Sequence, residues 1–570
     1  MLFEVKDHDL AARICKVKTN NGQFETPTIM PVINPGKQLI KAKDMPRYGA
    51  EILITNAYFL WKDFPQEAID RGVHDLLQFQ GPIMTDSGAY QYMEYGDIGL
   101  KNKDIIRFQE KIGVDIGVIL DQPTSSTERK DVENSVTETL KTAKASKALI
   151  EKSSVDWCGP IQGLSFPRLF EKSLQEMAKL PFSVHAIGSV VPLLMRYEFA
   201  TVTRALAKAK ELLPQGRLVH LFGAGHPMFF SFAAALGVDL FDSAAYALYA
   251  ADDRYMTQTG TEKLADLKYF PCSCPVCSKY TPEELAKNKN KEKLLAEHNL
   301  YITFEELRVI KQAIRDKTLW ELLEQRARSH PALLDAMREL IKHTKLINEF
   351  DPITKKHFFH VSDLSKYRPE LSRVGEHIKG IKADKAELPL FGQVPRTVIE
   401  CYPFAQLVVP KEEEFEVKKE KDIEKVVRDT SRYWFGTDVF PDNIRGERSR
   451  KTGKLRSVKS ATKLLVTVRA NDFMFLLHDA APSLHKKTKY PKHRVVMADN
   501  KEIQGLVSEG KTVFAPHIKD CDPDIIPGQQ VLVVTKKDKL LAAGEAVLCA
   551  REMKELEHGM AVKTRWTIKN

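Results

Sequence analysis

The chain has 570 residues, of which 43% are hydrophobic and 28% charged, with a formal net charge of +10 at pH 7, and we expect two to four domains because one hydrophobic core rarely supports such a length. Its longest strongly apolar run, residues 228–238, is much shorter than the about 20 residues of a membrane span, and no secretory leader is recognisable. These features argue against a membrane-bound or secreted protein and predict a cytoplasmic one.

Residues 26–246 contain eight short apolar runs that are rich in β-branched side chains. Amphipathic stretches long enough for helices lie between them, an alternation typical of parallel βα units. Eight such units make a (β/α)8 TIM barrel, the α/β fold that we predict, and an open doubly wound sheet is the alternative. The runs comprise residues 27–33, 52–60, 82–86, 115–121, 157–163, 183–188, 217–223 and 239–243.

Two of these runs end in an aspartate that can carry chemistry. Asp86 ends the third run in "PIMTDSGAYQY", and Asp242 lies near the end of the eighth in "FDSAAY". The carboxyl ends of barrel strands face one central pocket, so the two carboxylates can meet one substrate. Paired carboxylates support acid/base chemistry, or attack and proton transfer at an acetal carbon such as C1′ of a nucleoside. The alternative is that each aspartate only caps a helix or forms a turn.

Further polar residues follow other runs of the predicted barrel. Asp121 in "VILDQPT" and Gln162 in "GPIQGL" could read the amino and imino edge of a guanine-like base. Backbone groups of Gly188 and Ser189 could complete that site, and Tyr90 offers a flat face beside the first aspartate. Gln-Gly and Gly-Ser are also ordinary turn sequences, so their convergence on one rim is what favours a binding site.

The glycine-rich sequence "FGAGHP" at residues 222–227 could be mistaken for a phosphate-binding loop. It lacks the lysine of a P-loop and the full dinucleotide fingerprint. We interpret it as a tight turn that lines the pocket, with His226 as a structural turn histidine in preference to a general base.

The segment "FPCSCPVCSKY" places three cysteines within six positions, and a histidine follows a lysine-rich helical stretch. Such a set offers four ligands to one tetrahedral zinc ion, and a full set of protein ligands is typical of a structural site. The predicted ligands are Cys272, Cys274, Cys277 and His298. The other five cysteines are scattered and are interpreted as reduced thiols. Three chance cysteines in a surface loop are the alternative.

Changes in composition predict four domains. Residues 304–350 are predicted to form two helices, with Pro331 in the first turn of the second helix. A boundary is expected directly after them. The predicted domains are a barrel with a zinc subdomain at about 270–300, a small mixed α+β domain, a basic α+β domain and a compact basic β-domain, at residues 1–350, 351–420, 421–492 and 493–570.

The positive charge is concentrated near the C-terminus. Residues 421–570 carry 29 Lys and Arg against 19 Asp and Glu, whereas residues 1–420 sum to zero. The densest basic segment is 445–463, and a second cluster spans 486–494. A neutral body joined to a basic end is typical of a protein that holds a polyanion, which favours nucleic acid as the partner. A lysine-rich surface that maintains solubility is the alternative.

Several of these motifs resemble those of one family. The sequences "TDSGAYQ", "LDQPT", "PIQG", "HAIGSVVPLL" and "GVDLFDS", together with the cysteine series, are similar to tRNA-guanine transglycosylases of the archaeal type over residues 1–347. The sequence from about residue 493 is similar to the PUA domain of RNA-modifying enzymes. The resemblance therefore implies an enzyme that acts on tRNA.

The implied reaction replaces the encoded guanine at position 15, in the D-loop of tRNA, with 7-cyano-7-deazaguanine (preQ0) in archaeosine biosynthesis. The resemblance also implies one structural zinc ion per subunit, a homodimer, and no need for ATP or a redox cofactor. Ala89 and the loop after the eighth run follow the archaeal pattern, which favours the cyano base. The alternatives are an archaeosine synthase-like paralogue, a non-catalytic tRNA-binding subunit and a zinc hydrolase, although a Cys3His shell leaves little room for a catalytic water.

Carried over residue by residue, the resemblance makes Asp86 and Asp242 the catalytic pair. One attacks C1′ to form a covalent ribosyl-enzyme intermediate, and the other moves protons. We favour Asp242 for attack and Asp86 for acid/base work, because Asp86 lies beside Tyr90, which is expected to stack on the base. The residues expected to read the edge of the base are Asp121, Gln162 and Ser189.

Overall fold

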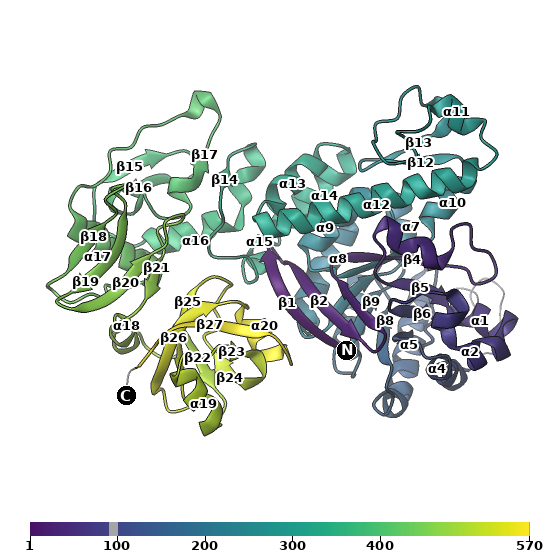
Figure 1. Ribbon diagram of the computed structural model, residues 1–570, viewed down its shortest axis with the longest axis horizontal. Helices are drawn as coiled ribbons and strands as arrows, with labels where there is room; N and C mark the ends of the chain where they lie inside the picture. The colour runs from purple at the N-terminus through teal and green to yellow at the C-terminus, as the bar shows by residue number, and fades with distance from the viewer. Residues whose placement is uncertain (90–100, 569–570) are drawn as a thin grey trace. The chain divides into compact units, whose positions relative to one another are not determined.

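The central sheet of the protein is a closed barrel. The computed structural model describes residues 1–89 and 101–568 (Figure 1). The strand order of the barrel is β10-β11-β4-β5-β6-β7-β8-β9. Neighbouring strands are parallel throughout. The strands are β4 (Thr28–Ile33), β5 (Leu53–Asn56), β6 (Ile83–Asp86), β7 (Ile116–Val118), β8 (Asp156–Ile161), β9 (Val184–Ile187), β10 (Leu218–Leu221) and β11 (Leu240–Ser243). The predicted TIM barrel is confirmed, and the open sheet is excluded.

Each predicted apolar run overlaps one strand of the barrel, and each strand is shorter than its run; β8 begins one residue before the run that predicts it. The clearest difference is in run 52–60, where β5 ends at Asn56 and helix α1 (Ala57–Asp63) begins at once. The Asn56 side chain accepts hydrogen bonds from the backbone N–H groups of Tyr58 and Phe59. This capping starts the helix inside a run that hydrophobicity alone extends as a strand.

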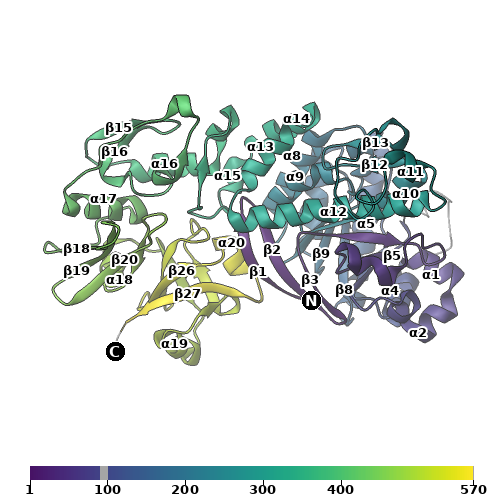
Figure 2. The ribbon, with the colours of Figure 1, turned by 45° about the horizontal axis from the view of Figure 1, so that its top comes forward.

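Helices that follow the strands pack against the barrel, for example α5 and α6 against β8, and α4 against β7. Helices α4, α5, α8 and α9 are labelled in Figure 2. Helix α6 buries four apolar residues at helical spacing, Leu169, Phe170, Leu174 and Met177. The helices of this part are α2 (Pro65–Leu77), α4 (Asn102–Lys111), α5 (Arg129–Ile150), α6 (Pro167–Met177), α7 (Val191–Met195), α8 (Phe199–Leu212), α9 (Phe230–Ala235) and α10 (Ala245–Ala251).

The barrel is flanked in sequence by smaller elements. A three-stranded sheet, β1 (Leu2–Asp9), β2 (Ala12–Thr19) and β3 (Gly22–Glu25), precedes it. An antiparallel pair, β12 (Arg254–Met256) and β13 (Thr261–Lys263), follows it, and helix α11 (Pro282–Ala286) comes next. The three predicted cysteine ligands lie in the segment between β13 and α11.

The segment predicted as two helices contains parts of four, so that prediction is wrong. The helices are α12 (Lys291–Asp316), α13 (Leu319–Ala327), α14 (Pro331–Ile341) and α15 (Thr344–Ile347). Pro331 is the first residue of α14, as expected. Lys317 has a left-handed backbone conformation, with φ 62°, and it separates α12 from α13. The apolar spacing continues across that break, which is why periodicity alone does not reveal it.

The chain forms two compact units. The first comprises Met1–Asp7, Ala12–Ile314 and Gln325–Leu340, and the second comprises His8–Ala11, Arg315–Glu324 and Ile341–Asn570. No helix among the described residues combines the length and the apolar character needed to cross a bilayer.

The second unit contains two larger antiparallel or mixed sheets and several short elements. A four-stranded sheet follows helix α17 (Ile423–Phe435), and a six-stranded sheet with the order β23-β27-β26-β25-β22-β24 follows helix α18 (Ala481–Lys487). The four-stranded sheet comprises β18 (Arg445–Arg448), β19 (Leu455–Ser460), β20 (Lys463–Val468) and β21 (Phe475–Leu477). The six-stranded sheet comprises β22 (Arg494–Met497), β23 (Val513–Phe514), β24 (Ile518–Cys521), β25 (Gln530–Val534), β26 (Leu540–Ala546) and β27 (Met560–Thr567), with helices α19 (Lys501–Ser508) and α20 (Ala550–Glu555).

Residues 351–420 contain four short strands and one α-helix, besides several turns of 3-10 helix. They are β14 (Phe358–Phe359), α16 (Pro369–Ile378), β15 (Lys385–Leu388), β16 (Gly392–Pro395) and β17 (Leu407–Val408). The four-domain division of the chain stays a prediction.

A buried lysine holds the short N-terminal segment of the second unit in place. Lys355 Nζ lies 2.7 Å from Asp9 Oδ1, 2.8 Å from Asp351 Oδ1 and 3.4 Å from Glu370 Oε1, and all four side chains are buried. An unpaired charge in such a position would cost several kcal/mol of folding free energy. The lysine and the carboxylates can therefore be buried only because they neutralise one another. They attach His8–Ala11 to residues far along the chain.

Candidate active site and metal site

Three carboxyl groups lie at the carboxyl ends of barrel strands. Asp86 is the last residue of β6, Asp242 is the third residue of β11, and Asp121 follows the end of β7. Burial, and after it the charge of Asp242, raises the pKa of Asp86; burial, and after it the charge of Asp86, raises the pKa of Asp121. The structure thus brings the three predicted acidic residues into one electrostatic environment.

Both carboxylate oxygens of Asp86 accept hydrogen bonds. The Asn56 amide donates to Oδ2 at 3.2 Å from the neighbouring strand, and the backbone N–H of Ser87 donates to Oδ1 at 2.9 Å. Burial, followed by the charge of Asp242, raises the pKa of Asp86 to about 6, against the opposing effect of the N–H groups of Ser87 and Gly88. A group with this pKa can hold or release a proton near neutral pH, as an acid/base residue must.

Gly88 allows the chain to turn sharply beside this carboxyl group. Its φ is +93°, and a Cβ atom there would lie 2.3 Å from the Cβ of Tyr58. Any other residue would clash with helix α1 and displace the turn. Tyr90, expected to stack on the base, lies outside the described residues.

Asp242 has a different pattern of hydrogen bonds. His220 Nε2 and the backbone N–H of Gly223 both lie 2.8 Å from Oδ1. Because a carboxylate oxygen only accepts, the Nε2 of His220 carries the proton in this contact. Among the described residues, Oδ2 of Asp242 has no hydrogen-bond partner. One oxygen is therefore held by two donors, and the other remains available to a substrate atom.

Asp121, Gln162 and Ser189 form a chain of hydrogen bonds across neighbouring strand ends. Ser189 Oγ donates to Gln162 Oε1 at 2.7 Å, and Gln162 Nε2 donates to Asp121 Oδ2 at 2.6 Å. Burial, then the charge of Asp86, raises the pKa of Asp121 to about 7, while the Gln162 bond opposes this shift. Three residues expected to contact one base are thus already connected to each other.

Gly188 contributes mainly through its small size. Its N–H donates to the carbonyl of Ile161 at 2.9 Å, so this backbone donor is already engaged. A Cβ atom on Gly188 would lie 2.7 Å from Gln162 Nε2. The glycine leaves room for the glutamine side chain to reach Asp121.

Sequence analysis missed His220 and Asn56, the side chains that bind Asp242 and Asp86. A signal for His220 existed, because it is a polar residue in the middle of the apolar run 217–223, three residues before the end of that run. The sequence did predict that the glycine-rich turn at residues 222–227 lines the pocket, and the N–H of Gly223 in that turn donates to Asp242. His226 lies elsewhere: its Nε2 contacts Thr261 Oγ1 at 2.9 Å, in keeping with the structural role expected for it.

The four predicted metal ligands converge. Their ligand atoms, from Cys272, Cys274, Cys277 and His298, all lie within 4.8 Å of one another. His298 Nδ1 is 3.3 Å from Cys277 Sγ and 3.5 Å from Cys274 Sγ. Bond lengths of about 2.3 Å to sulfur and 2.0–2.1 Å to nitrogen in a tetrahedron separate the two atoms by about 3.5 Å. The residues therefore fit one four-coordinate metal ion.

Neighbouring groups orient the histidine of this set. His298 Nε2 lies 2.9 Å from the backbone carbonyl of Met256, to which it donates, so Nδ1 faces the thiols. The Tyr255 ring stacks on His298 with centroids 3.7 Å apart, and its hydroxyl lies 3.3 Å from Cys277 Sγ. The ligand set is supported by a second layer of contacts, as metal sites usually are.

Comparison with known proteins agrees with the geometry. Residues 7–332 match the family described as queuine tRNA-ribosyltransferase, residues 425–491 match the patch-forming domain C2 of tRNA-guanine transglycosylase, and residues 494–567 match the PUA domain. The chain is 40% identical to the tRNA-guanine(15) transglycosylase of Methanocaldococcus jannaschii, with all of both chains covered. It is 42% identical to the protein of that name from Pyrococcus furiosus, over 99% of this chain and 97% of the relative. It is 41% identical to the protein of that name from Thermococcus kodakarensis, over 99% of this chain and 98% of the relative.

The purified protein should contain one equivalent of bound metal, measured by inductively coupled plasma mass spectrometry. Cys277→Ser should lose the metal, because a hydroxyl is a poor substitute for a thiolate, and should make the segment around α11 sensitive to protease. Ser278→Ala, at the exposed neighbouring position, is the control and should keep the metal. Equal metal content in both variants would contradict the assigned ligand set.

Proposed function

The chain belongs to the queuine tRNA-ribosyltransferase family, and we propose that it exchanges guanine 15 of tRNA for 7-cyano-7-deazaguanine (preQ0), in archaeosine biosynthesis. The observation that carries this proposal is its similarity, along its whole length, to relatives named tRNA-guanine(15) transglycosylase. The three carboxyl groups at the barrel mouth supply the chemistry that such an exchange requires. The choice of the incoming base rests on the archaeal motif pattern of the sequence.

In the first half of the reaction, Asp242 attacks C1′ of the target nucleoside through its free Oδ2. A bond forms between Oδ2 and C1′ while the bond between C1′ and N9 of guanine breaks. Asp86 gives its proton to the departing base, so guanine leaves neutral. The ribose remains attached to Asp242 as an ester, and the RNA backbone stays intact.

The second half reverses these steps with the incoming base. Asp86, now a carboxylate, takes the N9 proton of 7-cyano-7-deazaguanine, and N9 attacks C1′. The ester bond to Asp242 breaks, and both carboxyl groups return to their first states. No oxidant, reductant or nucleotide triphosphate enters this balance.

The chain of Ser189, Gln162 and Asp121 suits recognition of the base that occupies the site. Guanine and its deaza analogue share an edge with an amino donor, an imino donor and a carbonyl acceptor. Asp121 accepts from that edge, while Gln162 keeps a second amide hydrogen to donate. Splaying a base out of folded RNA costs a few kcal/mol, which these contacts and stacking must offset.

We assign zinc to the Cys3His site, in a structural role. Three thiolates and one imidazole are soft ligands in a tetrahedral set, and four protein ligands leave no open position for a water or substrate. When bound, the ion would hold together the segment between β13 and α12. The basic C-terminal region would hold the tRNA backbone, and homodimerisation and a cytoplasmic location remain our predictions.

A base-exchange assay tests the proposal directly. Wild-type protein given tRNA with labelled guanine at position 15 and an excess of unlabelled 7-cyano-7-deazaguanine should release the label. Asp242→Ala and Asp86→Ala should lower the rate by at least about 10³-fold, since each removes an essential partner, and both should still bind tRNA. Asp131→Ala, at an exposed position of α5, is the control. If wild type retains the label but binds tRNA, the protein is a binding subunit or an archaeosine synthase-like paralogue.

His220 should act as a positioning residue for Asp242. His220→Phe removes the donor to Oδ1 and should lower kcat by about 10²–10³-fold, with little change in the KM for tRNA. His220→Gln retains an N–H donor and should recover part of the loss. Equal loss of kcat in the two variants, with thermal stability equally reduced, would indicate a packing role only.

The pH dependence should report the acid/base carboxyl. Asp86 must be protonated to assist departure of guanine, so single-turnover formation of the covalent intermediate should slow as pH rises through its pKa of about 6. Asp121 has a pKa of about 7 and is the other carboxyl group that could cause this fall in rate. The variant Asp121→Asn removes that group, so the same fall in rate should persist if Asp86 causes it. A rate that increases over the same interval would contradict the acid role of Asp86.

A further inference from the structure

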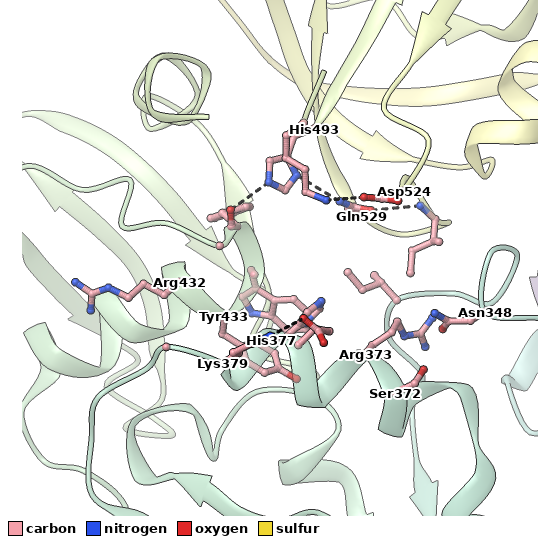
Figure 3. Close-up of a pocket in the computed structure, with 18 of the residues that line it drawn as sticks. Asn348, Ser372, Arg373, His377, Lys379, Arg432, Tyr433, His493, Asp524 and Gln529 are labelled. Carbon is pink, nitrogen blue, oxygen red and sulfur yellow. Dashed lines mark hydrogen bonds and ion pairs between the residues drawn. The ribbon is translucent and has the colours of Figure 1, made fainter. Parts of the chain in front are cut away.

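The second compact unit contains a cavity that takes no part in the proposed exchange chemistry. Its volume is about 570 Å³. The ends of helices α16 and α17 form one wall, and residues beside strands β22 and β25 form the other (Figure 3). This volume lies within the roughly 300–1,000 Å³ that is usual for small-ligand sites.

His377 presents unused hydrogen-bonding groups to this cavity. Its ring packs edge-on against Tyr433, with centroids 5.1 Å apart, and against Trp434 at 6.3 Å. Among the described residues, neither ring nitrogen has a hydrogen-bond partner. Burial, then the charges of Arg373 and Lys492, lowers its pKa to about 4. At neutral pH the imidazole is uncharged, so it offers one donor and one acceptor.

Most cations around the cavity are already paired, which favours one phosphate group over several: Arg373 lies 2.8 Å from Asp351, and Arg432 lies 2.6 Å from Asp429. Lys379 lies beside His377 in Figure 3, is 78% exposed, and has its nearest carboxylate, Glu376, 4.0 Å away. Lys492 lies 3.1 Å from Asp524 and is partly neutralised. Glu349 also lines the cavity, and these three carboxylates oppose a polyphosphate.

We propose that this cavity binds one unpaired nucleotide of the RNA substrate, with its base against His377 and its phosphate at Lys379. A base supplies donors, acceptors and a flat ring, which match the unused groups of the wall. It must be unpaired, because pairing in a duplex occupies the same edge. The inference rests on the proposed function, which makes RNA the substrate of this chain.

Affinity for full-length tRNA tests the site with paired variants of the whole protein. Lys379→Ala should weaken binding about 3- to 10-fold and lower the slope of log affinity against log salt by about one, since one phosphate contact is lost. Lys382→Ala, at an exposed lysine three residues further, should leave both values unchanged. His377→Phe keeps an aromatic ring without its nitrogens and should weaken binding about 5-fold, whereas His357→Phe, at an exposed histidine, should not.

A photo-crosslink identifies the occupant. His377→p-benzoylphenylalanine should crosslink to one unpaired position of tRNA, and the same residue at position 382 should not. If wild type binds and exchanges tRNA while the cavity variants match their controls, or if the crosslinks reach only protein, the proposal is overturned and the exchange function stands. A wild-type protein that binds no tRNA would overturn both.

Discussion

The enclosure of three carboxyl groups at one end of a closed barrel is the constraint on which the proposed chemistry depends. Closure brings β6, β7 and β11 around a single mouth, although Asp86, Asp121 and Asp242 are far apart in the sequence. Burial and mutual repulsion raise the pKa of Asp86 to about 6 and that of Asp121 to about 7. Exposed on a surface, the same residues would be ordinary carboxylates with no proton to give at neutral pH.

Hydrogen bonds then distinguish two aspartates that are chemically identical. Asp86 has partners at both oxygens, including Asn56 from the neighbouring strand, and its raised pKa suits proton transfer. Asp242 receives two donors at Oδ1, from His220 and Gly223, which leaves Oδ2 for a bond to carbon. This division agrees with the assignment of attack to Asp242, and it gives that assignment a stronger physical basis than proximity to Tyr90.

The second unit carries the basic charge expected of a region that binds RNA. Its four-stranded sheet carries most of the dense basic segment at residues 445–463, where most of the cationic side chains are exposed. Phosphate contacts of this kind position an RNA without reading its sequence. The cavity around His377 adds unsatisfied polar groups, which can discriminate among bases. Affinity and selectivity would then arise from different surfaces of the same unit.

The sequence by itself determined the eight strands, the metal-ligand set and the carboxylates at the strand ends, because apolar periodicity and ligand spacing are local patterns. The sequence did not predict that a helix begins after the capping residue Asn56, or that the helix ending before Lys317 is interrupted there. At both positions a single residue overrides the apolar pattern around it. Only the tertiary structure decided that His220 meets Asp242, that Gln162 joins Ser189 to Asp121, and that the ring nitrogens of His377 have no hydrogen-bond partner in the described part of the chain. Those facts depend on which elements become neighbours and how much water they exclude, and no local pattern of residues encodes either.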